Sequence, residues 1–266
     1  MDLGLKGKIA LITGASAGIG FAIAQGLAAE GCKLIICGRN IDRLEQAKKN
    51  LLAEFPDVEL MSFCADVHNA ADSEELVNES LNKFGNINIL INNSEGATFS
   101  GEAVENLSDA DWKMVFEGKL MGYIRMTNLV LPGMKKHRWG RIINIVGTSG
   151  KEPSSRLVKS GVANAALMNF TKAVATQTAK YNVLITSVNP GIIDTPRHQQ
   201  YLEIAAQEQN KTIDSVKESI VNSIPIGRLG FSSELANLVI FLVSDCASYI
   251  TGVTIPVDGG LSSSAF

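Results

Sequence analysis

Short apolar stretches alternate with longer amphipathic ones along the 266 residues. The short stretches are rich in Ile and Val, which predicts buried β-strands. The longer ones repeat apolar residues every three or four positions, which predicts helices that cover a sheet. The predicted strands are IALITG, KLIICG, ELMSFCAD, INILINN, GRIINIVG, VLITSVNPG and TGVTIPVDGG, and the predicted helices span 19–30, 42–54, 71–84, 109–136, 160–181 and 233–244.

Strands and helices in this order predict parallel βαβ units. The fold class is therefore α/β, a doubly wound parallel sheet of the Rossmann type in three α/β/α layers. No repeat or Pro/Gly/Ser-rich linker divides the chain, so we expect one domain over residues 1–266. The long irregular stretch at 194–230 contains helical patterns at 201–210 and 213–223, and we expect it to form a substrate lid.

Composition narrows the function classes. Apolar residues make up 45% of the chain and charged residues 19%, which is typical of a globular protein and excludes a disordered one. The formal net charge is −3 and no dense Lys/Arg run is present, so we expect no nucleic-acid partner.

Cysteines and hydropathy indicate the compartment. The four cysteines form no C-x-x-C pair and no metal-ligand spacing with the three histidines, which predicts buried thiols in a reducing cytosol and no metal site. There is no basic segment followed by a long apolar one at the start, and no 18-residue apolar run without charge. We expect a soluble, cytoplasmic protein that does not bind membranes.

The first predicted strand runs into the turn TGASAGIG, residues 13–20, which opens a helix. Glycines permit a tight turn and close backbone approach, while a helix N-terminus offers unpaired N–H groups and a positive dipole end. A glycine-rich turn can also serve packing alone. The strand before it and the helix after it favour binding of a dinucleotide pyrophosphate.

The second predicted strand ends at Arg39, where dinucleotide sites that prefer NAD have an acidic residue. A guanidinium there can pair with the 2′-phosphate of NADP(H), so the sequence favours NADP(H) as cofactor. The alternative is a solvated surface arginine.

Together TGASAGIG, the CGR strand end, Asp66-Val67, LINN, NPGIIDT and IPVDGG resemble the short-chain dehydrogenase/reductase family over essentially the whole chain. The stretch from IPIGRLG to the closing IPVDGG is most similar to bacterial 3-oxoacyl-carrier-protein reductases. The resemblance implies a nucleotide-dependent oxidoreductase that assembles as a homotetramer or dimer through its long helices at 109 and 160. It also allows an acyl thioester as substrate.

The resemblance also implies a nearly complete cofactor site. One departure is Glu95, which stands where the family has glycine and would crowd the nicotinamide ribose if it turned inward. The implied residues are Gly14, Ser16, Gly18, Ile19 and Gly20 for the phosphates and adjacent ribose, Asp66 and Val67 for adenine, Asn92 and Ser94 for the nicotinamide ribose, and Pro190, Gly191, Ile193 and Thr195 for the carboxamide.

The family's catalytic group of Asn, Ser, Tyr and Lys is altered. The alignment that keeps the downstream Ala-Ala-Leu and Thr matches puts Ser160 at the Tyr position and Asn164 at the Lys position. A rival alignment pairs Ser155 with Lys159 and still supplies no tyrosine. The two remaining positions are Gly147, where Thr148 and Ser149 beside it offer hydroxyls in place of the family's Ser, and Lys119, which replaces Asn.

These substitutions bear directly on proton transfer. A serine has no accessible anion near neutral pH, whereas a tyrosine starts at a pKa of about 10. Lys119 could act as acid, base or anion anchor if it is desolvated, although most helix lysines are solvated. A histidine in the lid, His198, is expected to face solvent.

Three functions stay open. The first is an NADP(H)-dependent oxidoreductase that acts on a small carbonyl, hydroxyl or conjugated enoyl substrate with an atypical proton donor, since dienoyl-thioester reductases of the resembled family also lack the usual Tyr pairing. The second is a catalytically silent protein that binds NADP(H) or a ligand as sensor, scaffold or assembly subunit. The third is non-redox chemistry by Lys119, Thr148 or Ser160.

Overall fold

The structure is a computed structural model that describes residues 2–94 and 103–264. Its main sheet has seven parallel strands, and all seven predicted strands are confirmed. They are β1 (Ile9–Thr13), β2 (Lys33–Gly38), β3 (Leu60–Cys64), β4 (Ile89–Asn92), β5 (Gly140–Ile145), β6 (Val183–Pro190) and β9 (Thr254–Val257). The order β3-β2-β1-β4-β5-β6-β9 is the doubly wound Rossmann topology.

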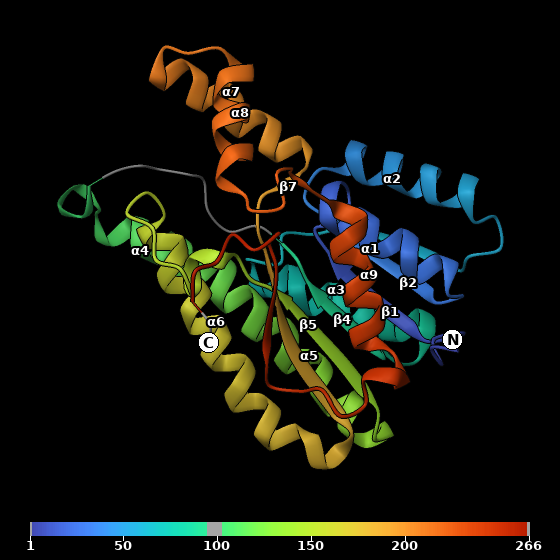
Figure 1. Ribbon diagram of the computed structural model, residues 1–266. Coiled ribbons are helices and arrows are strands. Elements are labelled where there is room, and N and C mark those ends of the chain that lie inside the picture. Colours follow the sequence, from blue (N-terminus) through green and yellow to red (C-terminus); the bar gives the residue numbers. More distant parts are fainter. Residues whose placement is uncertain (1, 95–102, 265–266) are drawn as a thin grey trace.

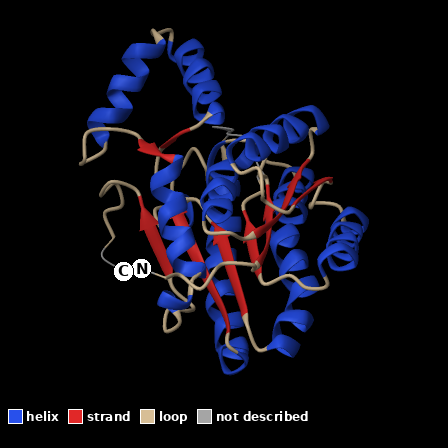
Figure 2. Ribbon diagram, turned by 90° about the vertical axis from the view of Figure 1, so that its right-hand side faces the viewer, coloured by secondary structure: helices blue, strands red, loops and turns tan. Residues whose placement is uncertain are grey.

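Helices cover both faces of this sheet (Figures 1 and 2). Side chains alternate along β1, so that Ala10 and Ile12 join one apolar core while Ile9 and Leu11 join the other. The first core is closed by α1 (Gly18–Ala29), α2 (Ile41–Glu54) and α9 (Ser232–Val243), and the second by α3 (Ala70–Phe84), α5 (Met121–His137) and α6 (Val158–Thr178).

The helix predicted over 109–136 is divided in the structure. Helix α4 (Asp109–Val115) is followed by the π-helical turn Phe116–Leu120, and α5 begins at Met121. A π-turn inserts one residue into the helical ladder and re-aims the side chains around it, and such turns often occur at functional sites. Lys119 lies in this turn. The apolar period continues through it, which is why the sequence pattern did not reveal the break.

The stretch 194–230 is more regular than predicted. Helices α7 (Pro196–Gln209) and α8 (Ile213–Ser223) pack through Leu202, Ala205 and Val216, and they project from the carboxyl ends of the strands (Figure 1). The short strands β7 (Ile193–Asp194) and β8 (Gly230–Phe231) pair at its base. Two-residue strands are too short for a periodic signal, so they could not be predicted.

The prediction of buried thiols is correct for two of the four cysteines. Cys32 and Cys37 are buried, and burial raises the pKa of each thiol to about 12. Cys64 and Cys246 are exposed, because Cys64 ends the edge strand β3 and Cys246 lies in the turn after α9. No helix in residues 2–94 or 103–264 has the length and apolarity to cross a membrane.

Arg141, at the start of β5, is the largest fully buried side chain of the described chain. Its guanidinium lies 4.4 Å from the centre of the Trp139 ring and donates to the carbonyl oxygen of Asn182 (3.1 Å) and to Asp245 Oδ1 (3.4 Å). Burial lowers the pKa of Arg141, while Asp245 opposes that shift. This cluster joins the strand to the turn after α9.

Replacing Arg141 with methionine should lower the free energy of unfolding by about 2 kcal/mol, because this buried side chain loses its hydrogen bonds to Asn182 and Asp245 and its stacking on Trp139. Chemical denaturation monitored by circular dichroism measures this change. Arg156→Met, at an exposed loop position, should change stability by less than about 0.5 kcal/mol. Equal denaturation midpoints for the two variants would contradict a structural role for the cluster.

Candidate active site

A cleft of about 1030 Å³ opens at the carboxyl ends of the parallel strands, where it is bounded by the glycine-rich turn, the ends of β2 to β6 and the first turns of α7. In open parallel sheets, ligands bind outside the carboxyl ends of the strands at the point where the strand order reverses. Here that point lies between β1 and β4.

The glycine-rich turn forms one wall of the cleft. Gly14 and Gly18 have φ of 64° and 56°, which only glycine adopts without strain. Helix α1 begins after Ala17, which gives no side-chain cap, so no side chain of the described residues satisfies the first N–H groups of this helix. Gly14, Ser16, Gly18 and Ile19 line the cleft.

Gly20 does not line the cleft. A Cβ at this position would collide with the carbonyl oxygen of Gly14 and with the side chain of Asn93. Its place is in the packing of the turn, so the expectation that Gly20 contacts the phosphates needs correction.

At the end of β2, Arg39 lines the cleft with its side chain 60% exposed. Its Nη1 lies 3.9 Å from Asp66 Oδ2, across the space between the ends of β2 and β3. Asn40 and Arg43 lie on the same wall, and neither was predicted from the sequence. Arg43 could have been predicted from its position in the first turn of α2, four residues after Arg39, where its side chain can reach the same wall.

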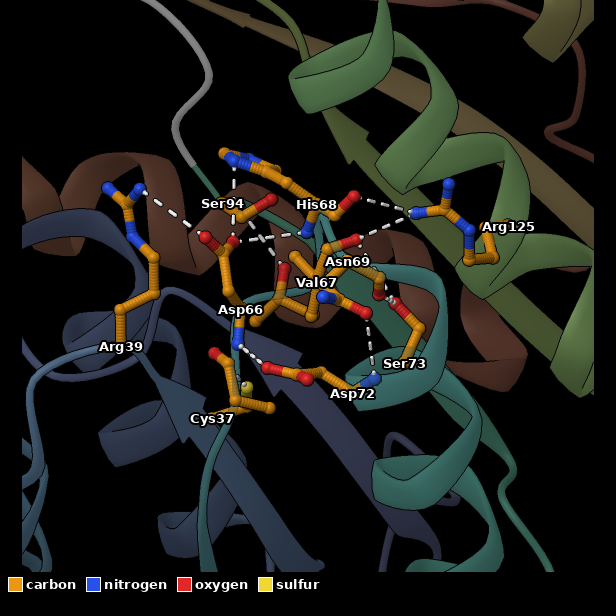
Figure 3. A network of polar contacts seen from close by, with 12 residues as sticks. Cys37, Arg39, Asp66, Val67, His68, Asn69, Asp72, Ser73, Ser94 and Arg125 are labelled. Atoms are coloured by element: carbon orange, nitrogen blue, oxygen red, sulfur yellow. Dashed lines mark hydrogen bonds and ion pairs between the residues drawn. The ribbon is translucent and has the colours of Figure 1, made fainter.

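Asp66 and Val67 lie at the end of β3 as predicted, and both line the cleft. Asp66 accepts a hydrogen bond from the backbone N–H of His68 (3.1 Å), and Figure 3 shows its carboxylate between Arg39 and the His68 ring. His68 also lines the cleft and was missed, because a lone histidine after a strand carries no motif.

After β4, the chain brings Asn93 and Ser94 to the cleft, but not Asn92. Asn92 is fully buried and its Nδ2 donates to Asn144 Oδ1 at 2.9 Å, so the prediction that Asn92 lines the nicotinamide ribose is wrong. Asn93 instead donates to the carbonyl oxygens of Thr13 (3.2 Å) and Gly14 (3.1 Å), which ties β4 to the glycine turn.

The remaining residues predicted to bind the nicotinamide part of the cofactor lie in the same region of the cleft. Pro190, Gly191, Ile193 and Thr195 line the cleft beside Ser94, whose buried Oγ has no hydrogen-bond partner in the described chain. Glu95 lies outside the described residues, so its effect on this end stays a prediction.

The four candidate catalytic residues lie on the walls of the same cleft: Lys119, Thr148, Ser160 and Asn164. Asn164 is 3% exposed and its Nδ2 donates to Ser149 Oγ (3.0 Å), while its Oδ1 has no hydrogen-bond partner among the described residues.

The rival alignment does not place its residues at the cleft. Ser155 is exposed and Lys159 Nζ lies 3.4 Å from Asp111 Oδ1, on α4. Neither residue is among those that line the cleft, so the structure favours the alignment through Ser160 and Asn164.

Lys119 is desolvated at the cleft wall. Burial lowers the pKa of its ammonium to about 8. The Nζ atom lies 5.8 Å from the centre of the Tyr123 ring, and no hydrogen bond or ion pair joins it to the part of the chain that the structure describes. An ammonium with this pKa can give up its proton near neutral pH.

An ammonium held partly out of water, with no ion partner among the described residues, lowers stability, so Lys119→Met should raise the free energy of unfolding at pH 7 by on the order of 2 kcal/mol. The pKa of Lys119 is about 8 in the folded protein and about 10.5 in the unfolded chain. Between these two pH values the unfolded chain binds more protons than the folded protein, so the parent protein becomes more stable as pH rises from about 8 to about 10.5. Denaturant titrations should therefore show a smaller difference in the free energy of unfolding between Lys119→Met and the parent protein at pH 10 than at pH 7. An equal difference at the two pH values would contradict the desolvation of Lys119.

Two tyrosines also line the cleft. The hydroxyl of Tyr123 lies 2.9 Å from the carbonyl oxygen of Ser94 and 3.1 Å from that of Ile145, and burial raises the pKa of this phenol. Tyr123 therefore cannot take over the role of an ionisable tyrosine. Tyr201 comes from the lid helix α7.

The expectation that His198 faces solvent is wrong. Its ring stacks on Tyr201 at 5.9 Å between centres, its Nε2 is buried without a hydrogen-bond partner in the described chain, and burial lowers its pKa. The capping of α7 by Thr195, which accepts from the N–H of His198 (3.2 Å), turns this first helical turn toward the cleft.

Comparison with known proteins identifies the family. Residues 8–205 match the family model described as short chain dehydrogenase. The chain belongs to the short-chain dehydrogenase family.

Family members similar to this chain include carbonyl reductases. The NADPH-dependent reductase BacG of Bacillus subtilis (strain 168) is 34% identical over 253 residues, which cover 95% of this chain and 97% of that protein. The 3-oxoacyl-[acyl-carrier-protein] reductase FabG of Aquifex aeolicus (strain VF5) is 34% identical over 265 residues, 98% of this chain and 100% of that protein.

A solved structure of a reductase is also similar to this chain. The L-sorbose reductase of Gluconobacter frateurii, crystallised with NADPH and L-sorbose, superimposes with a TM-score of 0.94 at 33% identity, and the match covers 99% of this chain and 100% of that one. Similarity in sequence, in chain length and in three-dimensional structure therefore all support the Rossmann-type fold and the family membership.

Proposed function

We propose that this protein is an NADP(H)-dependent reductase that acts on a carbonyl group with Lys119 as proton donor. The observation that carries the proposal is the cleft itself, which has Arg39 at one end, an uncapped helix N-terminus in the middle and a desolvated ammonium at the other. The NADPH dependence of BacG and the NADPH bound to L-sorbose reductase support the choice of cofactor.

The polar groups on the cleft wall fit a dinucleotide. The free N–H groups of α1 suit the pyrophosphate, and Arg39 suits a 2′-phosphate. The unpartnered Ser94 Oγ and Asn164 Oδ1 suit ribose hydroxyls, which can donate to them. The bound cofactor would supply the hydride.

Lys119 takes over the charge that the family places on α6. The ammonium sits in the π-turn on one side of the cleft, while the neutral Asn164 sits on α6 at the family's lysine position. In the proposed reaction Lys119 Nζ donates a proton to the substrate oxygen as it gains negative charge. The hydroxyls of Ser160 and Thr148 hydrogen-bond that oxygen and orient it.

The substrate class follows from the relatives in outline. A 3-oxoacyl thioester suits the likeness to FabG, and a sugar ketone suits the likeness to L-sorbose reductase. A conjugated enoyl thioester is compatible with the same donor, because reduction of either group needs one hydride and one proton.

A specific contact favours a second candidate function, nucleotide binding without turnover in a sensor or scaffold. Asn164 Nδ2 donates to Ser149 Oγ in a neutral hydrogen bond, where a catalytic group would need a charged partner. If Lys119 serves only to hold an anion, the cleft binds NADP(H) and no acid is left.

We also propose a homo-oligomer. The helices α5 and α6 expose apolar side chains in their N-terminal halves, with Met121 41% and Val162 45% exposed. Apolar side chains at these positions suit a self-complementary interface between two copies.

The test is a titration of the purified protein with NADPH and NADH by calorimetry, followed by NADPH oxidation with ketones, 3-oxoacyl thioesters and enoyl thioesters. Turnover that survives Tyr201→Phe and is lost in Lys119→Met supports the reductase. Loss of turnover in Tyr201→Phe with retention in Lys119→Met would transfer the acid role to the lid. NADPH binding without any turnover selects the second candidate, and no binding rejects both.

A further inference from the structure

The side of the lid that lines the cleft is mostly polar. Helix α7 begins at Pro196, and the contact between Thr195 Oγ1 and the N–H of His198 (3.2 Å) fixes its first turn. The apolar side chains of the lid pack instead between α7 and α8. A substrate under the lid therefore meets mainly polar groups. The residues of α7 and α8 that line the cleft are Pro196, Arg197, His198, Gln200, Tyr201 and Ile220.

Arg197 brings a positive charge to this side of the lid. Its side chain is half-buried at the cleft wall, and burial lowers the pKa of the guanidinium to about 10, so that it is charged at neutral pH. The guanidinium has five N–H donors in a planar fork, which matches the two oxygens of a carboxylate. The acid nearest in sequence, Asp194, accepts from Gln199 Nε2 (2.8 Å) and is not among the residues that line the cleft.

The charges differ between the two ends of the cleft. At the ends of β2 and β3, the cations Arg39 and Arg43 share the wall with the carboxylate of Asp66. At the other end the wall carries Lys119 and Arg197, and neither Asp nor Glu occurs among the described residues that line it there. Two cations in one recess create a positive potential that attracts an anion.

The proposed cofactor accounts for the other cations of the cleft. Its pyrophosphate suits the N–H groups at the start of α1, and its 2′-phosphate suits Arg39. The nicotinamide end of NADPH offers a ribose and a carboxamide, and both are neutral. In the proposed reaction Lys119 contacts the carbonyl oxygen of the substrate. Arg197 is then placed to bind a second, anionic group of the same substrate.

We infer that the substrate is an oxo acid, a carbonyl compound with a carboxylate of its own, and that Arg197 binds this carboxylate. The inference rests on the proposed function, because it requires NADP(H) in the cleft and the carbonyl at Lys119. The carboxylate does not react. It holds the substrate by two parallel hydrogen bonds from the guanidinium, a contact that a neutral ketone or thioester does not offer.

The test compares oxo acids with their methyl esters, which keep the carbonyl and remove the charge. The probes are 2-, 3- and 4-oxopentanoate and the three esters. Each is titrated by calorimetry into the protein saturated with NADP⁺, which has no hydride to transfer, so the readout does not depend on turnover. We expect at least one acid to bind about tenfold more tightly than its ester, because charge-assisted hydrogen bonds are about twice as strong as neutral ones.

Arg197→Met should weaken binding of that acid by about fivefold or more and change binding of its ester by less than about twofold. Arg197→Lys keeps the charge without the planar fork and should retain part of the preference. Lys211→Met is the matched control, since it removes a cation from an exposed position of the lid outside the cleft, and it should keep the full ratio. Thermal melts confirm that each variant is folded.

Three results would overturn the inference. They are the absence of any acid that binds more tightly than its ester, an unchanged ratio in Arg197→Met, and equal loss of the ratio in Lys211→Met. Weaker NADP⁺ binding in Arg197→Met with an unchanged ratio would assign the guanidinium to the pyrophosphate. Failure of the parent protein to bind NADP⁺ and NADPH rejects the proposed function itself.

Discussion

Replacing Lys119 with methionine is expected to lower kcat for carbonyl reduction by about 10²- to 10³-fold while changing the Kd for NADPH by less than about threefold. A positioned acid contributes about 10²–10⁴ in rate, and the hydroxyls of Ser160 and Thr148 cannot replace it, since neither is acidic near neutral pH. Stopped-flow hydride transfer under saturating NADPH measures the effect. Methionine suits the comparison because it keeps the length and the apolar packing of the side chain.

The pH dependence of the parent enzyme provides the second half of this test. The donor must be protonated and burial lowers the pKa of Lys119 to about 8, so kcat should fall as pH rises above about 8. Lys119→Arg keeps a positive charge that does not titrate in this range and should remove the inflection while leaving kcat low. Lys113→Met, at an exposed position of α4, is the matched control and should behave like the parent. A pH profile in Lys119→Met identical to that of the parent would assign the proton to another group.

The strand pattern made the sheet predictable because the central strands β1, β4 and β5 are buried along their whole length. Ile9, Ala10, Leu11 and Ile12 alternate between two cores, so Thr13 at the end of β1 is the strand's one polar position, and such strands form nearly continuous apolar runs. The π-turn at Phe116–Leu120 was not predictable, since it changes the ladder and not the apolar period. This turn places Lys119 at the cleft wall.

Individual site residues were predicted where a backbone motif places them and missed where a side-chain direction decides. Asn92 and Asn93 are adjacent on the same strand end, and the period of two sends one into the core and the other to the cleft. A sequence motif that contains both residues does not reveal which side chain is buried and which lines the cleft. His68 was missed, and His198 was wrongly expected to face solvent, for a related reason, because only the packing against α5 and the capping of α7 turn these rings toward the cleft.

Arg39→Asp is expected to weaken NADPH binding by about 10²-fold and to strengthen NADH binding severalfold, which reverses the cofactor preference. A charge-assisted hydrogen bond to phosphate contributes about 1.5–3 kcal/mol, and the new carboxylate would add repulsion beside Asp66 while accepting from the free ribose hydroxyls of NADH. Calorimetric titration of both nucleotides measures the reversal.

Two controls separate the contributions to that reversal. Arg39→Gln removes the cation without adding an anion, so it should lower NADPH affinity by less than Arg39→Asp and leave NADH affinity unchanged. Arg43→Gln removes the neighbouring cation on the same wall and tests whether the second guanidinium shares the phosphate. Because the side chain of Arg39 is 60% exposed, raising the salt concentration should narrow the preference of the parent protein for NADPH. A preference that survives both Arg39 variants and high salt would mean that shape, and not the charge at the end of β2, selects the nucleotide.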